Sequence, residues 1–330
     1  MTPAPPELDV LGIGHAIVDV LTHVEDGFLS DRHLVKGSMA LIDDDQARDL
    51  YGALGSAVEI SGGATANALA GVASFGGRAA FVGKVSADQL GDVFAHDIRA
   101  VGVRYSTPPA RGGRETARCL ILVTPDAHRT MNTFLGASAE LGPADIDEAE
   151  IASAAVTLSE GFLWDASSAR DALTAAMGAA RAAGRRMAFS LSDGFCVERH
   201  RADFLSLVRD KLDIVFANRD EICSLYEVDD FEQALARVRD DIGLAFVTHG
   251  PQGSVVLADG ERHDVPAHPV ERVIDTTGAG DLYAAGVLHG LTSGQDMETC
   301  ARLGSLAAAE VISHIGARPE VSLGELAKSL

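Results

Sequence analysis

Short apolar segments alternate with longer amphipathic or alanine-rich stretches along the second half of the chain. The apolar segments predict buried strands, and the stretches between them predict helices. Because strand, helix and strand follow one another in series, we expect parallel strands joined by right-handed crossovers, with helices on both faces of the sheet. The expected strands are Ala155–Ser159, Met187–Leu191, Asp213–Ala217 and Leu244–Thr248, and the expected helices are Ser168–Ala183, Arg199–Arg209 and Phe231–Asp241.

The pattern extends towards both ends of the chain. Two hairpins are predicted, and the hairpin of Arg118–Thr124 and Arg129–Leu135, with the turn Pro125–His128, has no helix beside it. We therefore expect this hairpin to leave the main sheet. The remaining elements are strands at Leu8–Ile13 and Ala79–Val85, helices at Ala64–Ser74, Asp92–Ala100, Gly280–Leu291 and Met297–Ser313, and a hairpin of Ser254–Leu257 and Glu261–Val265.

The predicted fold is α/β: a doubly wound, mostly parallel sheet with helices on both faces, plus a small β-rich lid. A chain of 330 residues is long enough for one large α/β domain with an appendage. We assign residues 1–13, 43–100 and 137–330 to the α/β domain. Residues 14–42 and 101–136 are assigned to the lid, which is expected to cover a substrate site.

The composition of the chain argues against several classes of partner and site. The chain has 27 Lys and Arg against 48 Asp and Glu, a net charge of −21, which argues against nucleic acid or an anionic membrane surface as a partner. The four cysteines form no C-x-x-C pair, so neither a disulfide framework nor a zinc site is indicated. No apolar run approaches the roughly 20 residues of a membrane span, and the N-terminus lacks the features of a signal peptide. The prediction is a soluble cytoplasmic protein.

The run Asp275–Asp281, with the sequence Asp-Thr-Thr-Gly-Ala-Gly-Asp, is the strongest chemical signal in the chain. It places small, glycine-punctuated backbone at a predicted helix start, where unpaired N–H groups and the helix dipole bind anions. A carboxylate there is a poor phosphate ligand, but it suits a base that takes a proton from an attacking hydroxyl. The run therefore predicts phosphoryl transfer to an alcohol.

Two other segments resemble phosphate-binding motifs but lack residues that those motifs require. Gly77–Lys84 invites comparison with a P-loop, but five residues separate Gly77 from Gly83, and Val85 stands where Ser or Thr holds magnesium. Gly12-Ile13-Gly14 invites comparison with a dinucleotide fingerprint, but Ile17 occupies the third glycine position. Both segments are interpreted as ordinary glycine turns.

The run resembles the D-T-x-G-A-G-D signature of the PfkB carbohydrate kinase family, whose fold is ribokinase-like. The resemblance implies that Asp281 is the catalytic base and that Gly278, Ala279 and Gly280 form an anion hole. It also implies that Thr277 binds the nucleotide. Gly62-Gly63-Ala64-Thr65-Ala66-Asn67 resembles the first signature of the family, in which Gly62 and Gly63 approach substrate hydroxyls and Asn67 orients the loop.

Two further segments resemble family elements for ATP and Mg²⁺. Asn218-Arg219-Asp220-Glu221 matches N-x-x-E, which implies that Asn218 and Glu221 hold Mg²⁺ through water and that Asn218 lies near ATP. Taken without the other motifs, the N-x-x-E segment would instead be interpreted as the start of a surface helix. Thr248, Gly250 and Gly253 match a T-x-G-x-x-G turn along the ATP. A monovalent cation is a further expectation, near Asp275, Thr277 and Gly316.

The acceptor side is assigned by the same resemblance. Asp19 matches an acid that binds sugar hydroxyls in the family. The alternative is that Asp19 caps a helix or a loop. Arg129 is expected to face the site and to steady the transferred phosphate, with an exposed hairpin charge as the alternative.

Three stretches, at 129–138, 160–164 and 190–193, resemble the adenosine kinases of the family. They suggest a purine slot walled by Phe134, Phe162, Leu163 and Trp164, for which core packing is the alternative. His15 stands where those kinases commonly carry Asn, and its ring can still donate or accept a hydrogen bond.

The resulting hypothesis is an ATP- and Mg²⁺-dependent kinase of a nucleoside 5′-hydroxyl, adenosine to AMP, with Asp281 as general base. A sugar kinase of the same fold, acting on ribose, fructose or a related sugar, is the alternative. A non-catalytic nucleotide-binding regulator is the alternative of another class. The expected partners are small molecules, with neither nucleic acid nor membrane, and the expected state is a monomer or homodimer.

Overall fold

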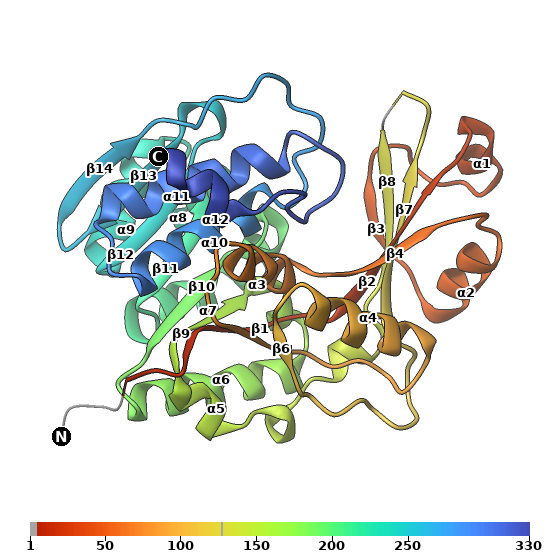
Figure 1. The fold of residues 1–330 in the computed structure, drawn as a ribbon, viewed down its shortest axis with the longest axis horizontal. Helices are drawn as coiled ribbons and strands as arrows, with labels where there is room; N and C mark the ends of the chain where they lie inside the picture. The colour runs from red at the N-terminus through yellow and green to blue at the C-terminus, as the bar shows by residue number, and fades with distance from the viewer. Residues whose placement is uncertain (1–4, 127) are drawn as a thin grey trace.

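The computed structural model describes residues 5–126 and 128–330. Residues 1–4, which belong to the segment considered for a signal peptide, and residue 127 of the expected hairpin turn lie outside the described residues. Figure 1 shows a large body and a smaller β-rich part beside it. In the described part of the chain, no helix is long and apolar enough to cross a membrane.

The large body is built on a nine-stranded sheet with the order β14-β13-β12-β11-β10-β9-β1-β5-β6. The pairs from β12 to β6 are parallel, and β13 and β14 are added antiparallel at one edge. This arrangement confirms the mostly parallel sheet expected from the alternation of elements. The strands are β1 Leu8–Ile13, β5 Ala79–Val82, β6 Arg104–Tyr105, β9 Ala154–Glu160, β10 Arg186–Ser190, β11 Ile214–Asn218, β12 Leu244–Thr248, β13 Ser254–Ala258 and β14 Glu261–Val265.

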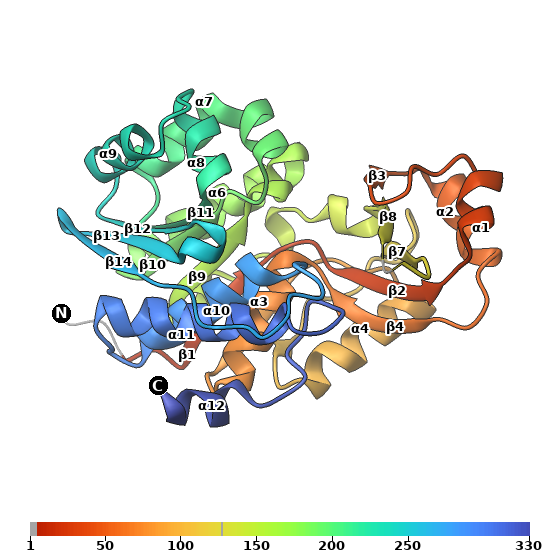
Figure 2. The ribbon, with the colours of Figure 1, turned by 90° about the horizontal axis from the view of Figure 1, so that it is seen from above.

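Helices cover both faces of this sheet, as a doubly wound fold requires (Figures 1 and 2). Neighbouring residues of β1 bury their side chains in two separate apolar clusters, Val10 in one and Leu11 in the other. One face carries α3 Ala64–Ser74, α4 Gln89–Ala100, α10 Ala279–Thr292, α11 Met297–Val311 and α12 Leu323–Leu326. The other carries α5 Glu148–Ser153, α6 Ser167–Ala182, α7 Gly194–Asp210, α8 Arg219–Tyr226 and α9 Phe231–Asp241.

The smaller part is a five-stranded sheet with the order β3-β8-β7-β2-β4, which we call the lid. Its outer face packs against α2 (Asp44–Gly52), and α1 (Asp26–Asp31) lies on the same side in Figure 1. Its inner face, which carries Asp19, Arg129 and Met131, is turned towards the large body. The lid strands are β2 Ile17–His23, β3 Met39–Leu41, β4 Val58–Gly62, β7 Ala117–Val123 and β8 Arg129–Phe134.

Two strands lie in a different sheet from the one that the expected boundaries imply. β4, inside the segment 43–100 assigned to the α/β domain, pairs with β2 of the lid. β6, inside the segment 101–136 assigned to the lid, pairs with β5 at the edge of the large sheet. The chain therefore leaves the lid at the Gly62-Gly63 pair, where β4 ends and α3 begins, rather than at residue 42.

Candidate active site

Asp281 lies in the first turn of α10, on the body side of the junction with the lid. The helix starts after Gly278, whose φ of +79° is in the left-handed region that glycine tolerates. A Cβ at Gly278 would also come within 2.8 Å of the Ala317 Cβ, so the backbone of the run packs closely on the C-terminal segment. Gly278, Ala279 and Gly280 thus form the N-terminal end of α10, where backbone N–H groups lack helical partners.

The two predicted signatures meet at Asp281. The Asn67 Nδ2 of α3 donates a hydrogen bond of 3.0 Å to the Asp281 Oδ2. Burial raises the pKa of Asp281 from 3.8 to about 7, although the hydrogen bond from Asn67 acts in the opposite direction. A carboxylate with a pKa near neutrality is well matched to proton transfer at physiological pH.

Asp19 of β2 and Gly62 of β4 lie diagonally across the β2–β4 pair, in which Gly62 is in register with Ile17 and Asp19 with Ile60. A Cβ at Gly62 would lie 2.3 Å from an Asp19 carboxylate oxygen, so any larger residue there would displace the Asp19 side chain. The next residue, Gly63, has a φ of +100° and caps α3. Burial raises the pKa of Asp19 to about 6, while the charges of Arg318 and Arg129 act to lower it. Asp19 thus lies at the hinge between the lid and the large body.

Arg129 joins the lid to the run Asp275–Asp281. Its guanidinium forms an ion pair with Asp275 and donates a hydrogen bond of 2.8 Å to the Thr277 Oγ1. The Asp275 carboxylate also accepts from the backbone N–H groups of Thr277 and Gly316, each at 3.0 Å. Burial acts to raise the pKa of Asp275, but these hydrogen bonds and the Arg129 charge outweigh it and hold the pKa below its usual value. The Arg129 guanidinium thus lies beside Asp275 and Thr277, where a monovalent cation was expected.

His15 is buried behind the site. Its Nδ1 lies 2.9 Å from the Ser138 Oγ and its Nε2 lies 3.4 Å from the Phe162 carbonyl oxygen. Its backbone N–H donates to the Glu160 carboxylate at 3.0 Å. The same carboxylate accepts from the Thr65 N–H and hydroxyl at 2.8 and 2.7 Å. Glu160, which the sequence analysis did not single out, ties the end of β1 to the start of α3.

Three of the predicted substrate residues lie in packed surroundings instead. Leu163 is fully buried, and Trp164 packs edge-on against Phe189 and Phe204 and donates a hydrogen bond of 2.8 Å to Asp203. The 3₁₀ turn Gly161–Asp165 directs both side chains into the core beneath α7, which corrects the expected purine wall.

Phe134 is the third, and it is also buried. It pairs in register with Arg118, whose guanidinium lies 5.5 Å from the centroids of both the Phe134 ring and the Tyr51 ring of α2. Phe134 therefore points to the outer face of the lid, away from Asp19, because strand residues alternate between faces.

The inner face of the lid provides an apolar surface that the sequence analysis missed. Cys119, Ile121 and Val123 of β7 form a cluster with Ile17, Leu21 and Met131. Cys119 is paired with Asp19, and Ile121 is paired with both Leu21 and Met131, so these side chains share one face of the sheet. We call this cluster the lid apolar strip. Asp19 is thus a carboxylate set beside an apolar surface.

The predicted nucleotide elements lie together at the carboxyl ends of β11 and β12. Asn218 and Thr248 are paired in register there. The turn after Thr248 is closed by a hydrogen bond of 2.7 Å from the His249 N–H to the Gly253 carbonyl oxygen, around Gly250. Loops at the carboxyl ends of parallel strands are where open α/β sheets bind ligands.

Asn218 and Glu221 form a reciprocal cap on α8. The Glu221 N–H donates to the Asn218 Oδ1 at 2.8 Å, and the Asn218 N–H and Nδ2 donate to the Glu221 carboxylate at 2.9 and 2.6 Å. Burial raises the pKa of Glu221 to about 7, the hydrogen bond from Asn218 opposes this, and the carboxylates of Asp193, Asp220 and Asp281 add to it. Such a concentration of carboxylates fits a hydrated divalent cation, because the cation would offset their repulsion. No cluster of three or more His, Cys, Asp or Glu side chains among the described residues is arranged to bind a metal directly.

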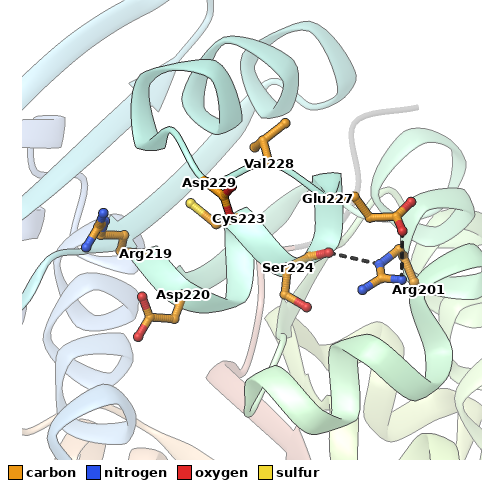
Figure 3. A pocket seen from close by; sticks show the side chains of 8 residues that line it. All are labelled: Arg201, Arg219, Asp220, Cys223, Ser224, Glu227, Val228 and Asp229. Atoms are coloured by element: carbon orange, nitrogen blue, oxygen red, sulfur yellow. Dashed lines mark hydrogen bonds and ion pairs between the residues drawn. The ribbon is translucent and has the colours of Figure 1, made fainter.

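A cavity of about 470 Å³ runs along α8 on the side of α7 (Figure 3). Arg201 is fixed there by hydrogen bonds to the Ser224 carbonyl oxygen at 2.9 Å and to Glu227 at 3.2 Å. The lining of the cavity includes Arg219 and Asp220, which lie between Asn218 and Glu221 in the sequence, but none of the predicted site residues. We therefore place the site at the junction of lid and body, not in this cavity.

A family model for pfkB carbohydrate kinases matches residues 37–322. The chain belongs to this family. Among solved structures, this kinase is similar to an adenosine kinase from Sinorhizobium meliloti, with 52% identity, a TM-score of 0.90, and coverage of 98% of this chain and 99% of that chain. It is also similar to a probable sugar kinase protein from Rhizobium etli, with 50% identity, a TM-score of 0.91, and coverage of 98% of both chains.

Among curated proteins, a 5-dehydro-2-deoxygluconokinase from Bacillus velezensis is 29% identical over 282 residues, which span 80% of this chain and 83% of that protein. The matches agree on a kinase of sugar or nucleoside hydroxyls with a ribokinase-like fold. This kinase is therefore a phosphotransferase with an alcohol group as acceptor.

Proposed function

We propose that this kinase transfers the γ-phosphoryl group of ATP to the 5′-hydroxyl of a nucleoside, with adenosine as the principal acceptor. The similarity to the Sinorhizobium meliloti adenosine kinase over nearly the whole chain supports this proposal. The observation that carries it is the chemistry of the inner face of the lid. Asp19 is a hydrogen-bond acceptor for sugar hydroxyls, and the lid apolar strip lies on the same face beside it.

This combination suits a molecule with one hydroxylated end and one flat, apolar end. A ribose bound at Asp19 would place its base against the lid apolar strip, where burial of the ring removes apolar surface from water. A free sugar has no part that gains from such a surface. The base slot is therefore proposed at the lid, where Ile17, Leu21 and Met131 of the strip are only partly buried, and not at Leu163 and Trp164, which pack in the core cluster beneath α7.

In the proposed reaction, Asp281 accepts the proton of the 5′-hydroxyl as its oxygen forms the new bond to the γ-phosphorus. The bond from that phosphorus to the bridging oxygen breaks, and ADP leaves. Asn67 holds the Asp281 carboxylate in place through its hydrogen bond of 3.0 Å. The N–H groups at the start of α10 face the charge that develops on the phosphoryl oxygens.

Asn218 and Glu221 would hold hydrated Mg²⁺, which neutralises charge on the phosphates when it is bound. Thr248, Gly250 and Gly253 would line the nucleotide beside them. Arg129 brings a positive charge from the lid to the run Asp275–Asp281 and holds the two parts together. Closure of the lid at this contact would exclude water, which otherwise competes with the acceptor hydroxyl.

A sugar kinase is the second candidate, because the curated relative from Bacillus velezensis is a 5-dehydro-2-deoxygluconokinase. A panel of nucleosides and free sugars with ATP and Mg²⁺ separates the two, with ADP release as the readout. The Asp281→Asn variant serves as the blank for contaminating kinases. We expect kcat/KM for adenosine to exceed that for ribose and fructose by about 100-fold, as the lost burial of a base implies. A free sugar that is turned over faster than every nucleoside would overturn the proposal.

A further inference from the structure

Arg318 lies in the segment between α11 and α12 and reaches the hinge of the lid. Its Nη2 donates hydrogen bonds to the Ser61 carbonyl oxygen at 2.7 Å and to the Ser61 hydroxyl at 3.0 Å. Ser61 directly precedes the Gly62-Gly63 pair, at which β4 of the lid passes into α3. The C-terminal segment is thus tied to the point where Gly62 meets Asp19.

Ser61 is held from a second side by Asp97 of α4. The Ser61 N–H and hydroxyl donate to one oxygen of Asp97, at 2.8 and 2.5 Å. Asp97, Ser61 and Arg318 therefore form a continuous network across the hinge. Such a network fixes the backbone next to Gly62, and with it the place of Asp19.

Two other nitrogen atoms of Arg318 take no part in the hydrogen bonds to Ser61. Its Nε and Nη1 atoms are buried and have no hydrogen-bond partner among the described residues. Buried polar groups are normally paired, so the two unpaired nitrogens at this position need an explanation. The charges that act on the guanidinium are those of the Asp97, Asp19 and Asp281 carboxylates, and each opposes the effect of burial on its pKa. Burial lowers the pKa of Arg318 to about 10, so the group stays charged at neutral pH.

We propose that Arg318 is a positioning residue for phosphoryl transfer, which holds the lid hinge through Ser61 and supplies a positive charge that favours the ionised forms of Asp19 and Asp281. This inference rests on the proposed role of Asp281 as the base. Asp281 faces Asn67 from α3, Glu160 from β9, Asp19 from β2 and Arg318 from the C-terminal segment. Asp19 faces Arg318 and Arg129. Without Arg318, Asp281 would be left with two like charges and one neutral amide.

The test is the pH dependence of kcat/KM in the Arg318→Gln variant, measured on whichever acceptor the wild-type enzyme phosphorylates best. Loss of a neighbouring positive charge favours the protonated carboxyl, so we expect the pH at half-maximal activity to rise by about one unit. Below that pH, kcat/KM should fall by about tenfold relative to wild type. Arg302→Gln removes the same charge from an exposed position on α11 and should leave the profile unchanged.

The Arg318→Lys variant separates charge from geometry. It keeps the positive charge but replaces the planar guanidinium, whose Nη2 reaches both Ser61 oxygens, with a flexible ammonium, so the profile should stay in place while the acceptor KM rises several-fold. A wild-type profile in Arg318→Gln, or a shift in Arg318→Lys as large as in Arg318→Gln, would overturn the inference. If circular dichroism shows that Arg318→Gln is unfolded, the lysine variant decides alone: an unmoved profile with a raised KM supports the inference, and a moved profile overturns it.

A negative result here is distinguishable from failure of the proposed function. If the wild-type enzyme phosphorylates only a free sugar, the nucleoside proposal fails, but the pH profiles of the Arg318 variants can still be measured on that sugar. If adenosine is the acceptor and the profiles do not move, the nucleoside proposal stands and the role of Arg318 is refuted.

Discussion

The phosphate side and the acceptor side of the site are built in different ways. The phosphate side is one continuous run, Asp275–Asp281, at the start of α10. The acceptor side is assembled from β2, β4, β7 and β8, which are far apart in the chain and meet only in the lid sheet. The residues for phosphoryl transfer therefore lie in one short segment, whereas the surface that binds the acceptor depends on how the lid strands pair. The two sides should respond differently to substitution.

The largest expected effect is on the phosphate side. Asp281→Asn should lower kcat by about 10³-fold, because an amide cannot accept the hydroxyl proton in the reaction. The substitution is isosteric, so binding of ATP and of the acceptor, followed by calorimetry, should change little. A variant that retains turnover within a few-fold of wild type would show that Asp281 is not the base.

Asp19→Asn tests the acceptor side. Hydrogen bonds to a charged group contribute about 1.5–3 kcal/mol, so the acceptor KM should rise by roughly 10- to 100-fold. The KM for ATP should stay near its wild-type value, because Asp19 lies on the lid and the nucleotide elements lie at the ends of β11 and β12. Equal increases in both KM values would contradict the separation of the two sides.

A smaller effect is expected at the lid apolar strip. Met131→Gln should raise the KM for adenosine by about five- to tenfold, because a polar amide replaces an apolar contact of the base. The KM for free ribose should be unaffected, which makes ribose an internal control. Met39→Gln is the matched control: Met39 pairs with Met131 on the edge strand β3, one strand further from Asp19. An equal effect of Met39→Gln would place the base elsewhere.

The last expected effect concerns stability and not activity. The folded-state pKa of Asp281, about 7, lies above the ordinary value of 3.8, so between these values the folded chain holds a proton that the unfolded chain has released. The contribution of Asp281 to stability is therefore lost as pH rises through about 7. Asparagine does not titrate. The Tm of Asp281→Asn should exceed that of wild type at about pH 8, and the difference should shrink towards about pH 4. A constant difference across this range would argue against a buried, titrating carboxyl.

The same contrast explains what could be predicted from the sequence. The main-sheet strands and the start of α10 were predictable because each is a local pattern: a buried apolar run, or a glycine-rich helix start. α3 and α9 have the expected bounds, Ala64–Ser74 and Phe231–Asp241. The structure also brings Asn67 to Asp281 and Asn218 beside Thr248, as expected if each segment belongs to one site.

What could not be predicted depends on contacts between distant residues. Phe134, Leu163 and Trp164 were assigned to the substrate from the resemblance to adenosine kinases, but the direction of each side chain is set by strand alternation and by a 3₁₀ turn. The lid apolar strip emerges only when Leu21, Ile121 and Met131 are placed in register. Glu160 and Arg318 carry no local motif: the hydrogen bonds that make them significant reach residues between 95 and 257 positions away along the chain.

The most direct test of the central claim is a competition experiment with the wild-type enzyme. Adenosine and ribose are supplied together at equal concentration with limiting ATP and Mg²⁺, and the phosphorylated products are identified by ³¹P NMR. We expect nearly all of the phosphate on the 5′-oxygen of adenosine. Phosphate found mainly on ribose, or on another hydroxyl of adenosine, would contradict it.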